Sequence, residues 1–316
     1  MPDCLLTIGG IPLKVQTPFS RNLAQSFLPF LLPQRKKIFR PWHLQSLPLE
    51  TDNYLKESQK IKLKIARLKK RLAIFSQFHP DWRLKERNLL QAHFLNHSAL
   101  GAVSFYLNDP VFIDQKKRQI LHFFSHPPSL RADFFTNGLL TQAYSQLLAL
   151  NKGLLLHSAG VAKNKKAYLF LGPSGEGKST LAFLCRRNTV LGDDIIALKK
   201  TGGSYSAFAT PWKQRDFIQP EAHLSFPVAA IFFLKKSQRI FFQPLEPKQA
   251  LFKILTSSVH FLFYTEEPFI HTLFSTCADF VRNIPAFSME FCQDKDFWPA
   301  LEKALADYKI KDASRR

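Results

Sequence analysis

Residues 167–180 read AYLFLGPSGEGKST, and this stretch decides the fold class. Its first five residues are apolar, which is typical of a strand covered on both faces of a sheet. The next eight, residues 172–179, match the pattern GxxxxGK[ST] at every fixed position. A run compatible with a helix continues from Ser179 to Leu184. A strand, a glycine-rich loop and a helix in this order predict an α/β fold with a phosphate-binding loop.

The residues of this loop are expected to bind the phosphates of a nucleotide. Glycines allow backbone conformations in which successive N–H groups turn inward toward phosphate oxygens. Lys178 is expected to neutralise the β- and γ-phosphates, and the Ser179 hydroxyl to bind Mg²⁺. The N-terminus of the following helix adds positive field at the same place. The predicted nucleotide-binding residues are Gly172, Pro173, Ser174, Gly175, Glu176, Gly177, Lys178, Ser179 and Thr180.

Two adjacent carboxylates, Asp193 and Asp194, follow the loop, with Asp193 fifteen residues after Lys178. A helix and then a short strand over 189–192 would return the chain to the same sheet edge, beside the phosphates. One carboxylate can hold Mg²⁺ while the other accepts the proton of an attacking hydroxyl. The alternative is a pair that ends a strand in a solvated turn, and the phosphate-binding loop upstream favours the functional interpretation.

His157 is a further candidate, fifteen residues before Gly172. The apolar run over 154–156 predicts a short strand that ends at His157, before a turn at Ser158-Ala159-Gly160. If this strand pairs with 167–171, the imidazole lies either at the nucleotide end of the sheet or at the opposite end. The register of the hairpin decides between them, and the sequence does not give it. Taken alone, a histidine after a leucine run is more often a core residue.

Residues 154–184, LLLHSAGVAKNKKAYLFLGPSGEGKSTLAFL, and the later VLGDDIIAL resemble HPr kinase/phosphorylase and the wider HPr-kinase-like proteins. These are relatives of the phosphoenolpyruvate carboxykinase nucleotide fold. The resemblance continues more weakly over about residues 131–308. It implies a mixed sheet flanked by helices, with ATP and Mg²⁺ as cofactors, and it makes a homo-oligomer plausible.

The resemblance also implies roles for the candidate residues. Ser179 and one aspartate of the pair would hold Mg²⁺, and the other aspartate would act as base on a seryl hydroxyl. We assign the base to Asp193 and the metal to Asp194, an assignment that the spacing does not distinguish from its reverse. His157 would approach the transferred phosphoryl group. The family's second signature, an acidic residue in an Arg-Gly segment, has no clear counterpart over 199–220. The resemblance therefore implies neither reverse phosphorolysis nor the usual carrier-protein substrate.

Composition divides the chain into two parts. Residues 1–130 are expected to form a small, basic α+β accessory domain, and residues 131–316 an α/β catalytic domain. Strands are predicted over 71–75 and 101–107, and a strand pair over 228–234 and 239–242. Helices are predicted over 131–150, 247–256 and 294–306.

The formal net charge of +20 indicates an anionic partner. Positive charge is densest over residues 53–71, which contain eight Lys and Arg residues and the single acidic residue Glu57. A solvated helix face is the commoner explanation of such a run. An acidic acceptor or partner would fit this surface, and nucleic acid is a less favoured one.

The sequence lacks features that are typical of secreted, membrane-spanning and zinc-binding proteins. It has no apolar run of about 18 residues and no secretory leader at MPDCLLTIGG, so we expect a cytoplasmic protein without a membrane span. Four cysteines without CxxC spacing indicate reduced, structural thiols. Two histidine pairs at helical spacing lack the glutamate of an HExxH zinc site, which favours packing or surface roles; they are His93 with His97 and His122 with His126.

Three functions are consistent with these observations. The first is an ATP- and Mg²⁺-dependent kinase acting on a hydroxyl of a protein, peptide or small molecule. The second is a P-loop ATPase or nucleotide-sensing regulator, although neither an LSGGQ nor an NKxD motif occurs. The third is a nucleic-acid-binding protein built on the basic segment.

Overall fold

The computed structural model describes residues 4–16, 25–31, 41–48, 102–106, 109–114, 118–124, 132–173, 175–212, 223–257, 267–293 and 296–313. The chain divides into two compact units. Unit 1 comprises Met1–Leu147 with His260–His271, and unit 2 comprises Leu148–Val259 with Thr272–Arg316. The domain boundary predicted after residue 130 stays a prediction.

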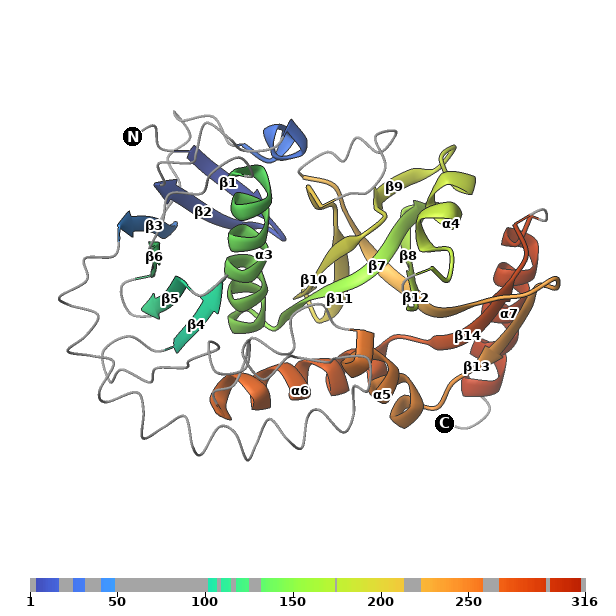
Figure 1. The fold of residues 1–316 in the computed structure, drawn as a ribbon. Coiled ribbons are helices and arrows are strands. Elements are labelled where there is room, and N and C mark those ends of the chain that lie inside the picture. The colour runs from blue at the N-terminus through green and yellow to red at the C-terminus, as the bar shows by residue number, and fades with distance from the viewer. Residues whose placement is uncertain are drawn as a thin grey trace. The chain divides into compact units, whose positions relative to one another are not determined.

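Unit 1 contains a mixed sheet. Its strands are β1 (Cys4–Ile8), β2 (Ile11–Gln16), β3 (Trp42–Pro48), β4 (Ala102–Tyr106), β5 (Asp109–Asp114) and β6 (Gln119–Phe124). Their order in the sheet is β1-β2-β3-β6-β5-β4 (Figure 1). β3 pairs in parallel with β2 and β6, and the other pairs are antiparallel. The strand predicted over 101–107 is confirmed as β4. The strand predicted over 71–75 and the basic segment 53–71 lie outside the described residues.

Helix α3 (Ala132–Leu150) confirms the helix predicted over 131–150. Its Tyr144 is fully buried, and the Tyr144 hydroxyl donates to the Ile11 carbonyl of β2 at 3.4 Å. The helix ends where the sequence indicates, because Lys152 takes a left-handed conformation with φ 54°.

The described residues of unit 2 form a second mixed sheet and four helices. The strands are β7 (Gly153–Lys163), β8 (Lys166–Leu171), β9 (Thr189–Gly192), β10 (Ile195–Thr201), β11 (Ser204–Phe208), β12 (Ser225–Lys236), β13 (Phe241–Pro244) and β14 (Ala286–Phe291). The helices are α4 (Lys178–Leu184), α5 (Pro247–Ser257), α6 (Glu267–Asn283), whose first residues belong to unit 1, and α7 (Trp298–Ala313). The strand order is β11-β10-β7-β8-β12-β14-β13, with β9 paired to β7. Because β11 also pairs with β12, each of the strands β11, β10, β7, β8 and β12 pairs with the next and the last pairs with the first. β14 and β13 extend the sheet beyond β12.

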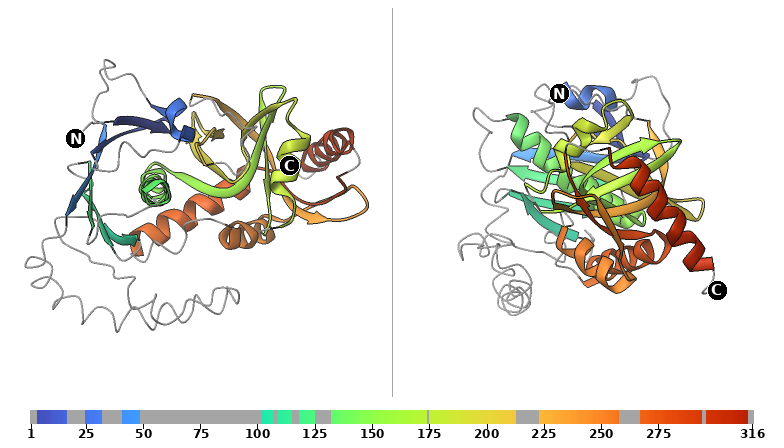
Figure 2. Two further views of the ribbon diagram at one scale, coloured as in Figure 1. Left: turned by 45° about the horizontal axis from the view of Figure 1, so that its top comes forward. Right: turned by 90° about the vertical axis from the view of Figure 1, so that its right-hand side faces the viewer.

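One face of this sheet carries an aromatic core. The ring of Phe232 on β12 stacks between Phe170 and Phe287, at centroid distances of 5.4 and 5.5 Å. α4 adds Leu181 to this cluster and α7 adds Leu301, and both side chains are fully buried. Helix α7 lies along the sheet beside β13 and β14 (Figure 2). A large mixed sheet flanked by helices therefore agrees with the predicted fold class at this level.

The strand that contains His157 is longer than predicted. β7 does not end at His157 but continues to Lys163, and the chain reverses at Asn164 and Lys165, which have φ values of 52° and 59°. The predicted turn at residues 158–160 is wrong because those small residues serve close packing. A Cβ on Gly160 would lie 2.8 Å from the Ile196 side chain of the neighbouring β10.

The strand pair predicted over 228–234 and 239–242 is also wrong. Both segments are strands, β12 and β13, but β14 lies between them. β14 runs parallel to β12 and antiparallel to β13. It places the fully buried Phe287 and Met289 in the aromatic core, so burial of a distant segment displaces the local hairpin.

The two C-terminal helix predictions have different outcomes. The helix over 247–256 is confirmed as α5. The helix predicted over 294–306 begins later, at Trp298, and extends to Ala313. Asp296 sets its start, since its carboxylate accepts the Trp298 N–H at 3.1 Å.

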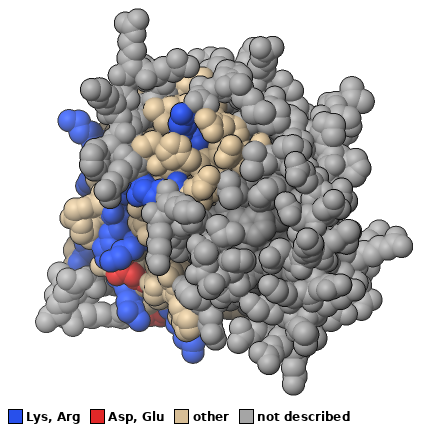
Figure 3. All heavy atoms as spheres, turned by 90° about the vertical axis from the view of Figure 1, so that its left-hand side faces the viewer, with Lys and Arg blue, Asp and Glu red and all other residues tan. Residues whose placement is uncertain are grey.

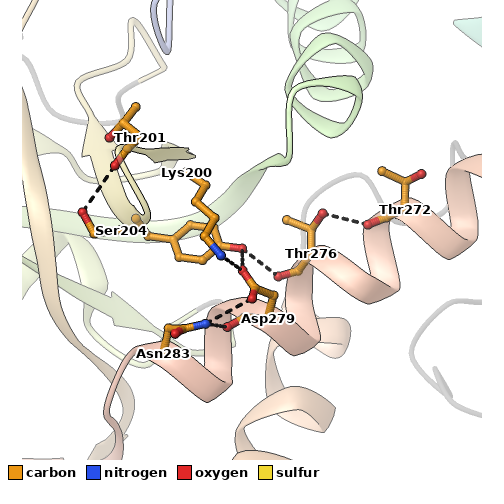
Figure 4. A network of polar contacts seen from close by, with 8 residues as sticks. Lys200, Thr201, Ser204, Thr272, Thr276, Asp279 and Asn283 are labelled. Carbon is orange, nitrogen blue, oxygen red and sulfur yellow. Dashed lines mark hydrogen bonds and ion pairs between the residues drawn. The ribbon is translucent and has the colours of Figure 1, made fainter.

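A polar network joins the β10–β11 hairpin to α6 (Figure 4). Lys200 Nζ and the Tyr205 hydroxyl each lie 2.7 Å from Oδ2 of Asp279. The Tyr205 oxygen is also 3.3 Å from the Thr276 carbonyl, and Asn283 donates to the Asp279 backbone and carboxylate. Burial and the neighbouring carboxylate raise the pKa of Tyr205, so the phenol stays protonated and donates.

Asp279→Asn is expected to lower the free energy of unfolding at neutral pH by about 1 kcal/mol, because the amide keeps the shape but loses the charge. Hydrogen bonds from Lys200 and then Tyr205 lower the pKa of Asp279 below its ordinary 3.8. Its contribution is therefore complete above pH 3.8 and is lost as the pH falls through the lower native-state pKa. Urea unfolding at neutral and acid pH tests this, with the exposed Asp307→Asn on α7 as control. An equal loss at every pH would contradict it.

The four cysteines agree with the prediction of reduced thiols. None of them forms a disulfide, and Cys185 and Cys277 are buried. Burial raises the pKa of both thiols to about 12, so they remain protonated and unreactive.

The described residues include a face on which basic side chains predominate over acidic ones. On the face drawn in Figure 3, their Lys and Arg side chains outnumber their Asp and Glu side chains. No helix among them is both long and apolar enough to cross a bilayer. His122 lies on β6, whereas His93, His97 and His126 fall outside the described residues.

Candidate functional site

The predicted phosphate-binding loop joins the end of β8, at Leu171, to the start of α4, at Lys178. This is the strand-loop-helix context that the sequence predicts. β8, β12 and β14 run in parallel, so their carboxyl ends meet at the edge of the sheet that carries the loop. Ligands of open α/β sheets bind at such an edge. Ser174 of the loop lies outside the described residues.

The three glycines of the loop, Gly172, Gly175 and Gly177, have positive φ angles that other residues rarely adopt. Gly175 has φ 88° and Gly177, which precedes α4, has φ 96°. A Cβ on Gly177 would also lie 2.9 Å from the Phe291 ring, whereas none of the described atoms lies within 4 Å of a Cβ on Gly175. The glycines at these positions are therefore required by conformation, and Gly177 also by space.

Gly177→Ala is expected to destabilise the protein by about 2 kcal/mol, and Gly175→Ala by about 1 kcal/mol, because only the first adds a clash to the left-handed strain. Gly202→Ala is the control, since Gly202 has φ 57° in the β10–β11 turn, without described atoms within 4 Å of its Cβ. Urea unfolding measures all three variants. Equal losses at Gly177 and Gly202 would show that the Phe291 contact does not constrain the loop.

Glu176 fastens the loop to the neighbouring strand. Its Oε2 accepts the backbone N–H of Lys236, the last residue of β12, at 3.0 Å. The Glu176 N–H in turn points to the Pro173 carbonyl at 3.4 Å, which closes a tight turn. This variable position of the loop pattern thus fixes the loop against the sheet edge.

Lys178 is buried inside the loop, with 6% of its surface exposed. Its Nζ donates to the carbonyl oxygens of Gly172 at 2.8 Å and Pro173 at 2.9 Å. Burial lowers the pKa of the ammonium, and the negative charges of Asp194 and Glu176 oppose that shift. The cation is therefore held by the loop's own carbonyls and lies within electrostatic reach of two carboxylates.

The two aspartates lie in a short bend between β9 and β10. β9 and β10 both pair antiparallel with β7, at Gly192 opposite Gly160 and at Ile195 opposite His157. Beside this bend, the Ser158 N–H donates to the Asp194 carbonyl at 2.9 Å. Their exposure differs. Asp193 is 1% exposed, whereas the Asp194 side chain is 25% exposed.

His157 lies at the end of the sheet from which the glycine-rich loop extends. Ser158 is opposite Leu171 in the β7–β8 pair, which places His157 beside the start of the loop. The structure thus decides the register that the sequence leaves open. The imidazole Nδ1 is 3.1 Å from Oδ1 of Asp194, and 30% of the histidine side chain is exposed. Such a contact fixes the orientation of the ring.

The structure therefore brings His157, Asp194, Lys178 and Glu176 together at one edge of the sheet. Thr180 and Ser179, in the first turn of α4, are half-buried beside them.

The sequence matches the family described as "SynChlorMet cassette protein ScmC" over residues 137–306, more than half of the chain. The chain belongs to the ScmC family. No curated protein matches the sequence. Among solved structures it is similar to the Hpr(Ser) kinase/phosphatase from Coxiella burnetii, with 13% identity and a TM-score of 0.31. That match covers 51% of this chain and 93% of the other, and at such values it establishes neither fold nor activity.

The donor set of this ScmC-family chain fits Mg²⁺ bound together with a nucleotide. Mg²⁺ prefers oxygen ligands and keeps waters and substrate phosphates, so one or two protein carboxylates are enough. The Asp194 carboxylate and the Ser179 hydroxyl are ligands of this kind. Among the described residues there is no group of three or more His, Cys, Asp or Glu side chains that could hold a metal.

One contact of the ScmC-family site gave no signal in the sequence. Lys236 meets Glu176 through its backbone amide, which carries no information about side-chain type. The contact depends on β12 lying next to β8, and these strands are far apart in the chain. Only the pairing of parallel strands reveals it.

Proposed function

We propose that this chain is an ATP- and Mg²⁺-dependent kinase that transfers the γ-phosphate to a hydroxyl acceptor. One observation carries the proposal. The ammonium of Lys178, inside a phosphate-binding loop, interacts electrostatically with Asp194, whose carboxylate also contacts His157. A cation, a carboxylate and a proton acceptor at the same sheet edge are the groups that phosphoryl transfer needs.

Nucleotide binding would exchange the partners of Lys178. Its two carbonyl acceptors, on Gly172 and Pro173, would give way to oxygens of the β- and γ-phosphates. The exchange is favourable because a charged phosphate accepts a stronger hydrogen bond from an ammonium than a neutral carbonyl does. Ser179 and Asp194 would hold Mg²⁺, which neutralises charge on the phosphates when it is bound.

The acceptor's proton has two candidate destinations. Asp193 is the base assigned from the sequence, but it is 1% exposed, so a hydroxyl reaches it only if the site opens. His157 is 30% exposed, and its Nδ1 faces Asp194. With a proton on Nδ1 donated to Asp194, the opposite nitrogen Nε2 accepts protons. The geometry therefore favours His157, oriented by Asp194, as the general base.

The proposed step balances as an in-line displacement. The acceptor oxygen forms a bond to the γ-phosphorus, while the bond from that phosphorus to the β–γ bridging oxygen breaks and ADP leaves. The hydroxyl proton passes to the base, and Lys178 with the loop N–H groups stabilises the charge on the transferred group.

Purified protein incubated with MgATP and candidate acceptors tests the proposal. Hydroxyl-bearing metabolites, seryl peptides and a proteome extract are the acceptors, and phosphorus NMR with mass spectrometry detects the product. We expect ADP to form in proportion to one phosphorylated acceptor. Hydrolysis by water at a rate that no acceptor changes would instead support the ATPase. Binding without turnover would support a nucleotide sensor.

Nucleic-acid binding, the third function, is tested by deleting the basic segment 53–71. Binding to DNA or RNA that falls steeply with salt and disappears when this segment is deleted would support a nucleic-acid-binding protein.

A further inference from the structure

Thr210 holds the strand segment that carries the two aspartates. It follows β11 and is fully buried. In the β10–β11 ladder, Ala197 is opposite Phe208, so continued pairing would set Thr210 opposite Ile195. The ladder ends before that pair, and Thr210 makes two other hydrogen bonds there.

These two hydrogen bonds are made to residues on either side of the aspartate pair. The Thr210 N–H donates to the Leu191 carbonyl at 3.3 Å, and the Thr210 hydroxyl donates to the Ile195 carbonyl. Leu191 and Ile195 lie on either side of residues 192–194. On the β7 side, Ser158 donates to the carbonyl of Asp194 itself. The segment is therefore fixed from both sides, by β7 and by Thr210.

Packing around the segment leaves little room for movement. A Cβ on Gly192 would lie 3.0 Å from the Ile196 side chain and 3.6 Å from the Thr210 hydroxyl oxygen. In such a site, the loss of one hydrogen bond leaves a buried carbonyl unsatisfied, and the backbone shifts to compensate.

We infer that Thr210 is a positioning residue, whose hydroxyl sets the placement of Asp194 relative to His157 and the phosphate-binding loop. The inference rests on the proposed function, in which these groups act together. Catalytic groups must be held within a fraction of an ångström, and a displacement of about 1 Å costs on the order of 100-fold in rate. Thr210 itself acts only through the backbone of the aspartate segment.

Three variants separate positioning from stability. Thr210→Val keeps the shape and removes the hydroxyl, and Thr210→Ser keeps the hydroxyl and removes a methyl group. Thr276→Val is the matched control, because Thr276 is 5% exposed and its hydroxyl donates to the Thr272 carbonyl at 2.7 Å. That bond lies within α6.

The measurements are kcat and KM for MgATP and the ¹⁵N signals of the His157 ring, which report its contact with Asp194 without any turnover. Thr210→Val is expected to lower kcat about 10- to 100-fold, to change KM less than about 3-fold, and to move the ring signals toward those of Asp194→Asn. Thr210→Ser should stay close to wild type, and Thr276→Val should leave the signals unchanged.

Unchanged His157 signals in a folded Thr210→Val protein would overturn the inference, as would equal losses in the Val and Ser variants. If Thr210→Val does not fold, the smaller Thr210→Ala variant replaces it in the same comparison with Thr210→Ser. The ring signals decide the positioning role even if the protein transfers no phosphate, so the two proposals fail separately.

Discussion

Lys178→Met is expected to weaken MgATP binding by about 100-fold or more. The wild-type ammonium makes two hydrogen bonds inside the loop, to Gly172 and Pro173, and would offer the same donors to phosphate. Hydrogen bonds to charged groups contribute about 1.5–3 kcal/mol each, and about 2.8 kcal/mol corresponds to 100-fold in affinity. Titration calorimetry with MgATP measures the loss directly.

Two comparisons make this result specific to the loop. Lys163→Met removes a different cation, whose Nζ lies 2.8 Å from Oε1 of Glu302 on α7. This variant should leave the affinity for MgATP unchanged. Lys178→Arg keeps the charge but not the shape, so it should bind with intermediate affinity. MgATP binding by folded Lys178→Met with wild-type heat and affinity would remove the basis for a nucleotide site.

Asp194→Asn is expected to lower kcat by about 10²- to 10⁴-fold, with a smaller change in KM. The amide cannot replace the negative charge that faces Lys178, and it weakens the hold on the His157 ring at Nδ1. It also removes the carboxylate assigned to Mg²⁺. Initial rates over a range of MgATP and Mg²⁺ concentrations separate these effects, because a lost metal ligand raises the Mg²⁺ requirement.

Asp193→Asn distinguishes the two assignments of the base. If His157 with Asp194 accepts the proton, Asp193→Asn should lower kcat less than Asp194→Asn and leave the ¹⁵N signals of the His157 ring unchanged. If Asp193 is the base, the order of the kcat losses reverses. A pH–rate profile of His157→Gln supplies the check, since the loss of activity toward acid pH should change only when the histidine takes the proton.

Local features of the sequence predicted the loop and its flanks. The apolar run of β8 and the helix α4 depend on residues close together in the chain, as does α3, and these elements are confirmed. Strand pairing was predicted less well. The hairpin of β12 and β13 was wrong because β14, which comes later in the chain at Ala286–Phe291, lies between them.

The sequence by itself determined the glycine-rich loop between β8 and α4, since glycines, a lysine and a hydroxyl at fixed spacing form it from adjacent residues. Only the tertiary structure decided that His157 meets Asp194, that Asp193 is buried, and that Thr210 holds the segment between β9 and β10. Hydrophobic periodicity fixes the type of an element, whereas its neighbours are chosen by the burial of the whole sheet. Contacts between strands therefore become visible only once the sheet is assembled.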